Sequence, residues 1–251
     1  MRKSSFGLAF GFVLATGAAG AADLKVLTVG GLQKPITPIS ADFEKESGNK
    51  VAFTFTNPAE LDKALAGGAY DAVVVADASI DALEKAGKIV AASHAKVVRG
   101  GIGVAVKEGA KFPDVSTPDA LKATLIAAKS IAYTDPATPN GSGEKTKQIL
   151  EGIGVWDVVV AKGKKMSLGA GKEAVAKGEE DIGLFNASES EAPGCVLAGI
   201  MPASIQRYTN YDAGVMAGGA NAAAAEAFVK YLTGKAAAAR WTAGHMTPVG
   251  G

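Results

Sequence analysis

Small and polar residues gather in five short segments, each placed where a strand should end and a helix should begin. The segments are 30–33, 56–59, 76–79, 135–143 and 186–189. Free backbone N–H groups at a helix start carry partial positive charge, so several helix starts facing one gap can bind an anion without a fixed cation. Taken alone, each segment is more simply explained as an ordinary helix cap, so the hypothesis of an anion site depends on their meeting.

The candidate ligand-binding residues come from four of these segments and from one arginine. They are Gly30, Gly31, Leu32, Gln33, Thr56, Asn57, Pro58, Arg99, Asp135, Asn140, Gly141, Ser142, Gly143, Asn186 and Ser188. Glycines let a ligand approach the backbone closely, and Thr56 and Asn57 offer a hydroxyl and an amide. Arg99 stands in an otherwise uncharged stretch and could hold a carboxylate through two hydrogen bonds, with an ion pair between lobes as the equal alternative.

The remaining reactive side chains form no recognisable metal, cofactor or nucleophile motif. Cys195 is the single cysteine, and His94 and His245 are the two histidines, so neither a metal site nor a bound cofactor is expected. Ser142 has no evident His–Asp partner that would make it a nucleophile.

The elements that must position these segments alternate between strands and helices. Strands are expected at 24–29, 50–55, 72–75, 101–106, 130–133 and 181–185. Helices are expected at 34–47, 59–66, 77–85, 119–128, 144–150, 171–177, 220–232 and 236–241. This order predicts an α/β fold with mainly parallel sheets flanked by helices, and places Lys145 and Lys147 on a solvated helix face.

The chain is expected to form two lobes, crossing between them near 99–101 and again near 206–211. Residues 23–100 together with 209–251 would make lobe 1, and residues 101–208 would make lobe 2. Ligands of open α/β sheets lie beyond the carboxyl ends of the strands, which places the five segments at the gap between the lobes.

Charge and the first residues bear on partners and location. The 251 residues include 26 Lys and Arg against 25 Asp and Glu, so the basic surplus of a nucleic-acid-binding protein is absent. Arg2 and Lys3, an apolar run over 6–15 and small residues up to Ala22 predict a secretory signal peptide at 1–22, with an N-terminal membrane anchor as the alternative. The mature protein is expected to be a soluble monomer in the periplasm.

Several stretches of the chain resemble the periplasmic molybdate-binding protein family of ABC transporters. They are LTVGGL (27–32), ADFEKESGNKVAFTF (41–55), AYDAVVVADASIDALEKAGKIV (69–90), KSIAYTDPATPNGSG (129–143), ILEGIGVWDVV (149–159) and EEDIGLFNASE (179–189). The resemblance implies the type II periplasmic binding fold, a small anionic ligand bound between the lobes, and an inner-membrane ABC permease as partner.

The positions that match the family's ligand residues have changed. Gly31 stands where the family has a serine, Asn186 stands where it has a tyrosine, and the second loop lacks consecutive small hydroxyl residues. The segment 98–103 instead resembles a divergent branch that includes aconitate isomerase, a cofactor-free enzyme. The loss of hydroxyl donors and the presence of Arg99 favour a carboxylate over a metal oxyanion.

Three functional hypotheses follow. The first is a receptor that closes on a di- or tricarboxylate, or on an oxyanion, and passes it to a permease. The second is an isomerase that moves an allylic proton of an unsaturated tricarboxylate, with Asp135, Glu189 or, less favourably, His94 as base. The third is an adhesion or scaffold module without a ligand. Binding a ligand requires less of these residues than catalysing a reaction, so we favour the receptor over the enzyme.

Overall fold

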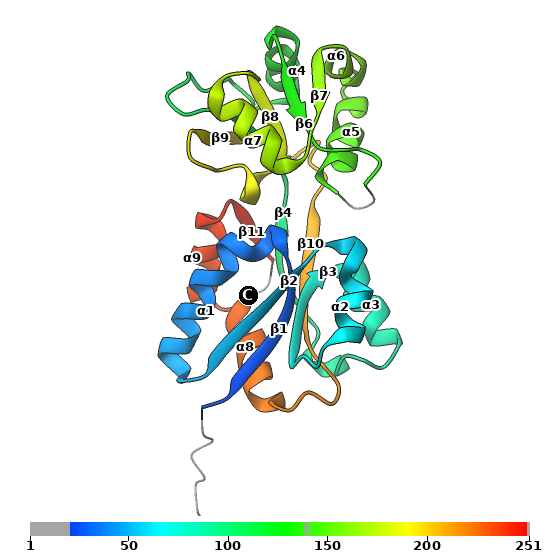
Figure 1. Ribbon diagram of the computed structural model, residues 1–251, viewed down its shortest axis with the longest axis vertical. Helices are drawn as coiled ribbons and strands as arrows, with labels where there is room; N and C mark the ends of the chain where they lie inside the picture. The colour runs from blue at the N-terminus through cyan, green and yellow to red at the C-terminus, as the bar shows by residue number, and fades with distance from the viewer. Residues whose placement is uncertain (1–20, 139–140, 250–251) are drawn as a thin grey trace, which may run out of the picture.

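The computed structural model describes residues 21–138 and 141–249, and within them the chain builds two separate sheets (Figure 1). One is six-stranded, in the order β11-β4-β10-β3-β1-β2, and the other is five-stranded, in the order β7-β6-β8-β5-β9. Most of the predicted signal peptide and the candidate residue Asn140 lie outside the described residues.

We call the six-stranded sheet and its helices lobe 1. Its strands are β1 (Asp23–Val29), β2 (Lys50–Thr56), β3 (Ala72–Ala76), β4 (Ala95–Gly100), β10 (Thr209–Val215) and β11 (Met246–Pro248). Its helices are α1 (Gln33–Ser47), α2 (Leu61–Gly67), α3 (Asp77–Lys85), α8 (Ala222–Leu232) and α9 (Lys235–Ala243), with short 3-10 turns at η1 (Gly30–Leu32), η2 (Pro58–Glu60) and η3 (Ala91–Ser93).

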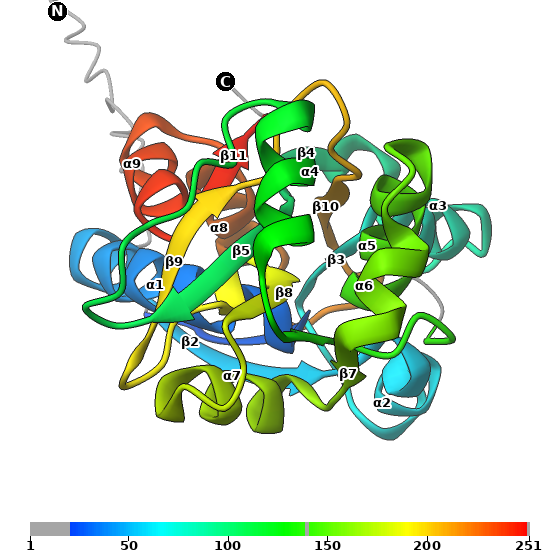
Figure 2. The same ribbon diagram turned by 90° about the horizontal axis from the view of Figure 1, so that it is seen from above.

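We call the five-stranded sheet and its helices lobe 2. Its strands are β5 (Ile102–Lys107), β6 (Ile131–Tyr133), β7 (Gly163–Lys165), β8 (Ile182–Asn186) and β9 (Cys195–Ile200). Its helices are α4 (Pro118–Ala127), α5 (Ser142–Gly152), α6 (Trp156–Lys162) and α7 (Leu168–Lys177), with a 3-10 turn at η4 (Ala187–Glu189). Lobe 2 lies over lobe 1 along the long axis of the molecule (Figure 2).

The predicted two-lobed α/β architecture is confirmed, but the expectation of mainly parallel sheets needs correction. β1 pairs in parallel with β2 and β3, and β6 with β7 and β8. β10 is antiparallel to β3 and β4, and β5 is antiparallel to β8 and β9. The antiparallel pairs involve the strands that carry the chain between the lobes. Gly101 alone separates β4 from β5, so the crossing sets the direction of both strands.

Each lobe buries its own apolar core, which gives the gap two rigid walls. In lobe 1, α1 buries Ile36, Ile39 and Phe43 against the sheet and ends at Gly48, whose left-handed φ of 76° suits glycine. β3 is buried over its first four residues, as expected for a strand covered by helices on both faces. Among the described residues, no helix is both long and apolar enough to cross a membrane.

Several elements were not predicted from the sequence. β7 and β11 have three residues each, too few to show a period. β4 ends at Gly100, and the segment 99–101 was interpreted only as a crossing between lobes.

Candidate functional site

The five segments follow the carboxyl ends of strands and face the gap between the lobes. η1, η2 and α3 begin directly after β1, β2 and β3 or one residue later, while η4 and the loop before α5 follow β8 and β6. Segments of the two lobes touch where Ser188 donates a hydrogen bond to the backbone oxygen of Gly31 over 3.1 Å. Of the five segments, 30–33, 76–79 and 186–189 line pockets of the gap, whereas the described residues of 56–59 and 135–143 do not appear in their linings.

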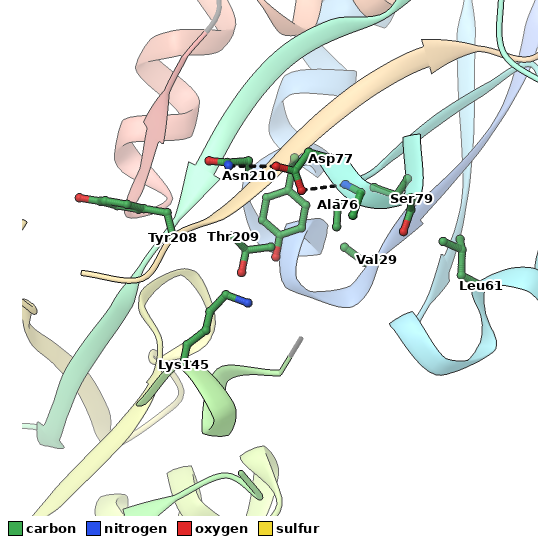
Figure 3. A pocket seen from close by; sticks show the side chains of 12 residues that line it. Val29, Leu61, Ala76, Asp77, Ser79, Lys145, Tyr208, Thr209 and Asn210 are labelled. Carbon is green, nitrogen blue, oxygen red and sulfur yellow. Dashed lines mark hydrogen bonds between the residues drawn. The ribbon is translucent and has the colours of Figure 1, made fainter. Parts of the chain in front are cut away.

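A cavity of about 290 Å³ lies in this gap (Figure 3). Lobe 1 supplies the ends of β1 and β3, the start of α3 and part of α2, including the apolar side chains of Val29, Leu61 and Val75. Residues 208–211, on the return crossing, form another wall, and Lys145 of α5 enters from lobe 2.

Asp77 places a fixed negative charge on the lobe 1 side of this cavity. It is the first residue of α3, and its carboxylate accepts hydrogen bonds from the backbone N–H of Ala78 over 2.8 Å and from the side-chain amide of Asn210 over 3.0 Å (Figure 3). Both donors hold the carboxylate at the positive end of the helix. The start of α3 is thus occupied by the chain's own anion.

Lys145 is the cationic group on the opposite side. Burial lowers the pKa of Lys145, while the charges of Glu144 and Asp77 act to raise it. The expectation that Lys145 lies on a solvated helix face is therefore wrong. Lys145 is in the first turn of α5, and side chains of helices lean toward the N-terminus, which here faces the gap.

A second pocket, of about 490 Å³, adjoins the cavity and shares Lys145, Tyr208 and Asn210 with it. We call it the basic pocket because it also contains Arg99 and Arg207, with Glu144 as the carboxylate in its lining. The guanidinium of Arg99 lies over the ring of Tyr208, 4.2 Å from its centre. No acceptor among the described residues reaches the buried Nε of Arg99.

Polar side chains of both lobes surround Gly31. A Cβ at Gly31 would lie 3.4 Å from the hydroxyl of Tyr211 and 3.6 Å from a carboxylate oxygen of Glu189. Asn186 donates to Glu189 over 2.7 Å and so holds that carboxylate in place. Burial, followed by the charge of Glu189, raises the pKa of Tyr211, so its hydroxyl remains a donor. A carboxylate and a phenol therefore stand beside Gly31, in place of a ring of hydroxyl donors.

Gly30, Gly31, Gln33 and Ser188 line a third pocket of about 510 Å³ on this side of the gap. Arg99, as described, lines the basic pocket. These are the predicted residues that the fold brings to the pockets of the gap.

Residues of the other predicted segments serve local structure. Leu32 is fully buried in the core of lobe 1. Asn57 caps η2 by accepting from the backbone N–H of Glu60 over 3.1 Å, and Pro58 and Thr56 flank it. These contacts agree with the helix-cap interpretation of the second segment.

The loop before α5 is held in a similar way. Asp135 accepts from the backbone N–H of Ala137 over 2.9 Å and pairs with Lys165 over 3.1 Å. The hydroxyl of Ser142 meets that of Thr134 at 2.8 Å. Gly141 is the N-cap of α5, and a Cβ at Gly143 would lie 2.3 Å from the backbone oxygen of Thr134. Glycine at 143 therefore permits the close approach that positions α5 and Lys145.

The three candidate bases are far from equivalent. His94 lies between Glu84 and Asp212 and lines neither the cavity nor the basic pocket. Asp135 is an exposed ion-pair partner, whereas Glu189 lies beside Gly31 at the gap. In the described residues, no group of three or more His, Cys, Asp or Glu is arranged to hold a metal ion.

Sequence reasoning missed Asp77, Lys145 and the residues 208–211. The segment 76–79 was expected at the gap. A carboxylate at a helix start is usually a cap, so Asp77 was not included among the candidate ligand-binding residues. Tyr208 and Asn210 belong to the return crossing, whose side chains no helix start or motif singles out.

Comparison with known proteins agrees with the fold. A family model described as bacterial extracellular solute-binding protein matches residues 24–247. The chain is 30% identical over 223 residues to an aconitate isomerase of Pseudomonas sp, covering 86% of this chain and 84% of that protein. It is 28% identical over 234 residues to a molybdate-binding protein of Azotobacter vinelandii, covering 90% of each.

A solved structure is similar over most of its length. The substrate-binding domain of a molybdenum ABC transporter protein from Clostridium difficile superimposes with a TM-score of 0.77 at 16% identity, covering 91% of this chain and 100% of that one. At that identity, the likeness concerns the fold.

Proposed function

Because this chain belongs to the bacterial extracellular solute-binding protein family, in its molybdate-binding-like group, we propose that it captures a di- or tricarboxylate between its lobes. It does so in the periplasm, as a monomer, and delivers the ligand to an inner-membrane ABC permease. Closure of two rigid lobes about the crossing strands encloses the ligand.

The observation that carries this proposal is the basic pocket beside the cavity. Arg99, Lys145 and Arg207 are the cations in its lining, against the single carboxylate of Glu144. A planar guanidinium matches a carboxylate through two parallel hydrogen bonds, and the buried Nε of Arg99 lacks an acceptor among the described residues.

The surroundings of Gly31 argue for a carboxylate over molybdate. A tetrahedral oxyanion needs several donors around one point. At Gly31 the chain instead presents the carboxylate of Glu189, held there by Asn186. The charge of Glu189 would repel a tetrahedral oxyanion bound at Gly31, whereas Glu189 is not in the lining of the basic pocket, where the carboxylates of the proposed ligand lie.

A thermal-shift screen of the purified mature protein tests the ligand class. The panel contains succinate, tricarballylate, citrate, molybdate, tungstate and sulfate. A ligand present at 100 times its Kd raises the free energy of unfolding by about 2.7 kcal/mol, so carboxylates should raise the Tm measurably. Stabilisation by the oxyanions alone would contradict the proposal.

A second candidate function is the isomerisation of an unsaturated tricarboxylate, which the similarity to an aconitate isomerase supports. The base would remove an allylic proton, and the cations of the basic pocket would stabilise the negative charge that develops. Glu189 and Asp77 are the carboxylates at the gap that could do so. Proton NMR of cis- or trans-aconitate with the protein in deuterated buffer tests this function, since interconversion or solvent exchange would favour the enzyme.

A further inference from the structure

The two pockets of the gap, the cavity and the basic pocket, contain different charged groups. The cavity carries the ionised carboxylate of Asp77 on the lobe 1 wall, whereas the adjoining basic pocket carries Arg99 and Arg207. Lys145 and Asn210 line both compartments, so one ligand can extend from one into the other. A ligand that carries full negative charge at both ends would meet repulsion in the cavity.

The carboxylate of Asp77 has acceptor capacity left for a ligand. An ionised carboxylate offers about four lone-pair sites, and the hydrogen bonds from Ala78 and Asn210 use two of them. Asp77 lines the cavity itself, so its remaining sites are within reach of a bound molecule (Figure 3). A group that donates a hydrogen bond is the natural partner there.

We propose that Asp77 selects a hydroxylated di- or tricarboxylate, whose hydroxyl donates to Asp77 while its carboxylates lie in the basic pocket. This inference rests on the proposed capture of a carboxylate in the gap. An ammonium group would also donate to Asp77, but Lys145, which enters the same cavity, would repel it. A neutral hydroxyl donates a hydrogen bond to Asp77 and is not repelled by Lys145.

Matched ligand pairs that differ by one hydroxyl test the proposal. Isothermal titration calorimetry compares citrate with tricarballylate, and malate with succinate. We expect the unaltered protein to bind the hydroxylated member of each pair about tenfold more tightly or better, the effect of one hydrogen bond to a charged group. In Asp77→Ala, the affinity for citrate should fall by about the same factor, and that for tricarballylate should stay equal or rise.

Two further variants separate selectivity from folding. Asp77→Asn keeps a side-chain acceptor at the start of α3 but removes the charge, so an intermediate preference is expected. Asp81→Ala removes an exposed carboxylate one turn further along α3 and should retain the full preference. Circular dichroism melting checks that each variant is folded.

The outcomes are distinguishable. Equal affinity for both members of a pair, or a preference that survives in folded Asp77→Ala, would overturn the role of Asp77 and leave carboxylate capture intact. Tighter binding of cis- or trans-aconitate than of citrate would also overturn it. If none of these carboxylates binds, the proposed function fails and this inference fails with it.

Discussion

At the scale of single residues, the contacts of Arg99 are incomplete, and the proposed carboxylate site depends on them. Its guanidinium packs over Tyr208, yet its buried Nε meets no acceptor among the described residues. A buried donor without a partner is costly, and a ligand carboxylate in the basic pocket would supply one.

Replacing Arg99 should therefore weaken carboxylate binding while leaving the fold intact. We expect Arg99→Ala to weaken binding by about 2 kcal/mol, or about thirtyfold in Kd. Arg99→Lys should lose most of this affinity as well, because lysine provides neither the planar fork nor the stacked geometry. Calorimetric titration measures both variants. Full affinity in Arg99→Ala would mean that this arginine has been wrongly assigned.

At the scale of elements, His94 bridges α3 and β10, which present Asp77 and Asn210 to the cavity. One ring nitrogen lies 2.7 Å from Glu84 of α3, and the other lies 2.8 Å from Asp212 of β10. Asp212 is buried, so loss of this hydrogen-bond partner would be costly. Burial alone would lower the pKa of His94, but the hydrogen bonds to Asp212 and Glu84 outweigh it and raise that pKa.

The contacts of His94 with Glu84 and Asp212 predict that the free energy of unfolding depends on pH, and they fix the sign of that dependence. Because the folded pKa of His94 is raised above 6.5, its contribution is fully present below that pH and is lost as pH rises through the raised pKa. His94→Gln should be less stable by about 1–3 kcal/mol below pH 6.5, with a smaller deficit at higher pH. Urea unfolding across pH measures the difference, and a deficit that does not change with pH would contradict the prediction.

At the scale of the whole molecule, one carboxylate joins the lobes beside the gap. Glu191 of lobe 2 pairs with Lys34 of α1, and its other oxygen lies 3.0 Å from the ring of His245. The hydrogen bonds from Lys34 and then His245 lower the pKa of Glu191. Glu191 lies near the bond between Ser188 and Gly31, so these contacts hold the lobes together on one side.

Loss of these contacts should favour an open molecule. We expect Glu191→Gln to increase the radius of gyration of the ligand-free protein in small-angle X-ray scattering. The side chain is 36% exposed, so the change in the closing free energy should be about 1 kcal/mol or less. Since the pKa of Glu191 is lowered from 4.5, its contribution is present above that pH and is lost as pH falls through the lowered pKa.

Glu173→Gln is the matched control for this experiment. Glu173 pairs with Lys177 within α7 of lobe 2, so its removal breaks an exposed ion pair without touching lobe 1. The control should scatter like the unaltered protein. An equal expansion in both variants, or none in Glu191→Gln, would mean that Glu191 does not hold the lobes together.

The sequence by itself determined the family and most of the longer helices and strands, because these depend on local patterns, whereas the three-residue strands β7 and β11 and the antiparallel pairings were not encoded there. The cap at Asn57 and the left-handed glycine at Gly48 were readable from a few neighbouring residues. Only the tertiary structure decided which side chains meet. Asp77, Lys145 and Asn210 come from separate elements of two lobes, and their proximity depends on how those lobes pack, which no local spacing encodes.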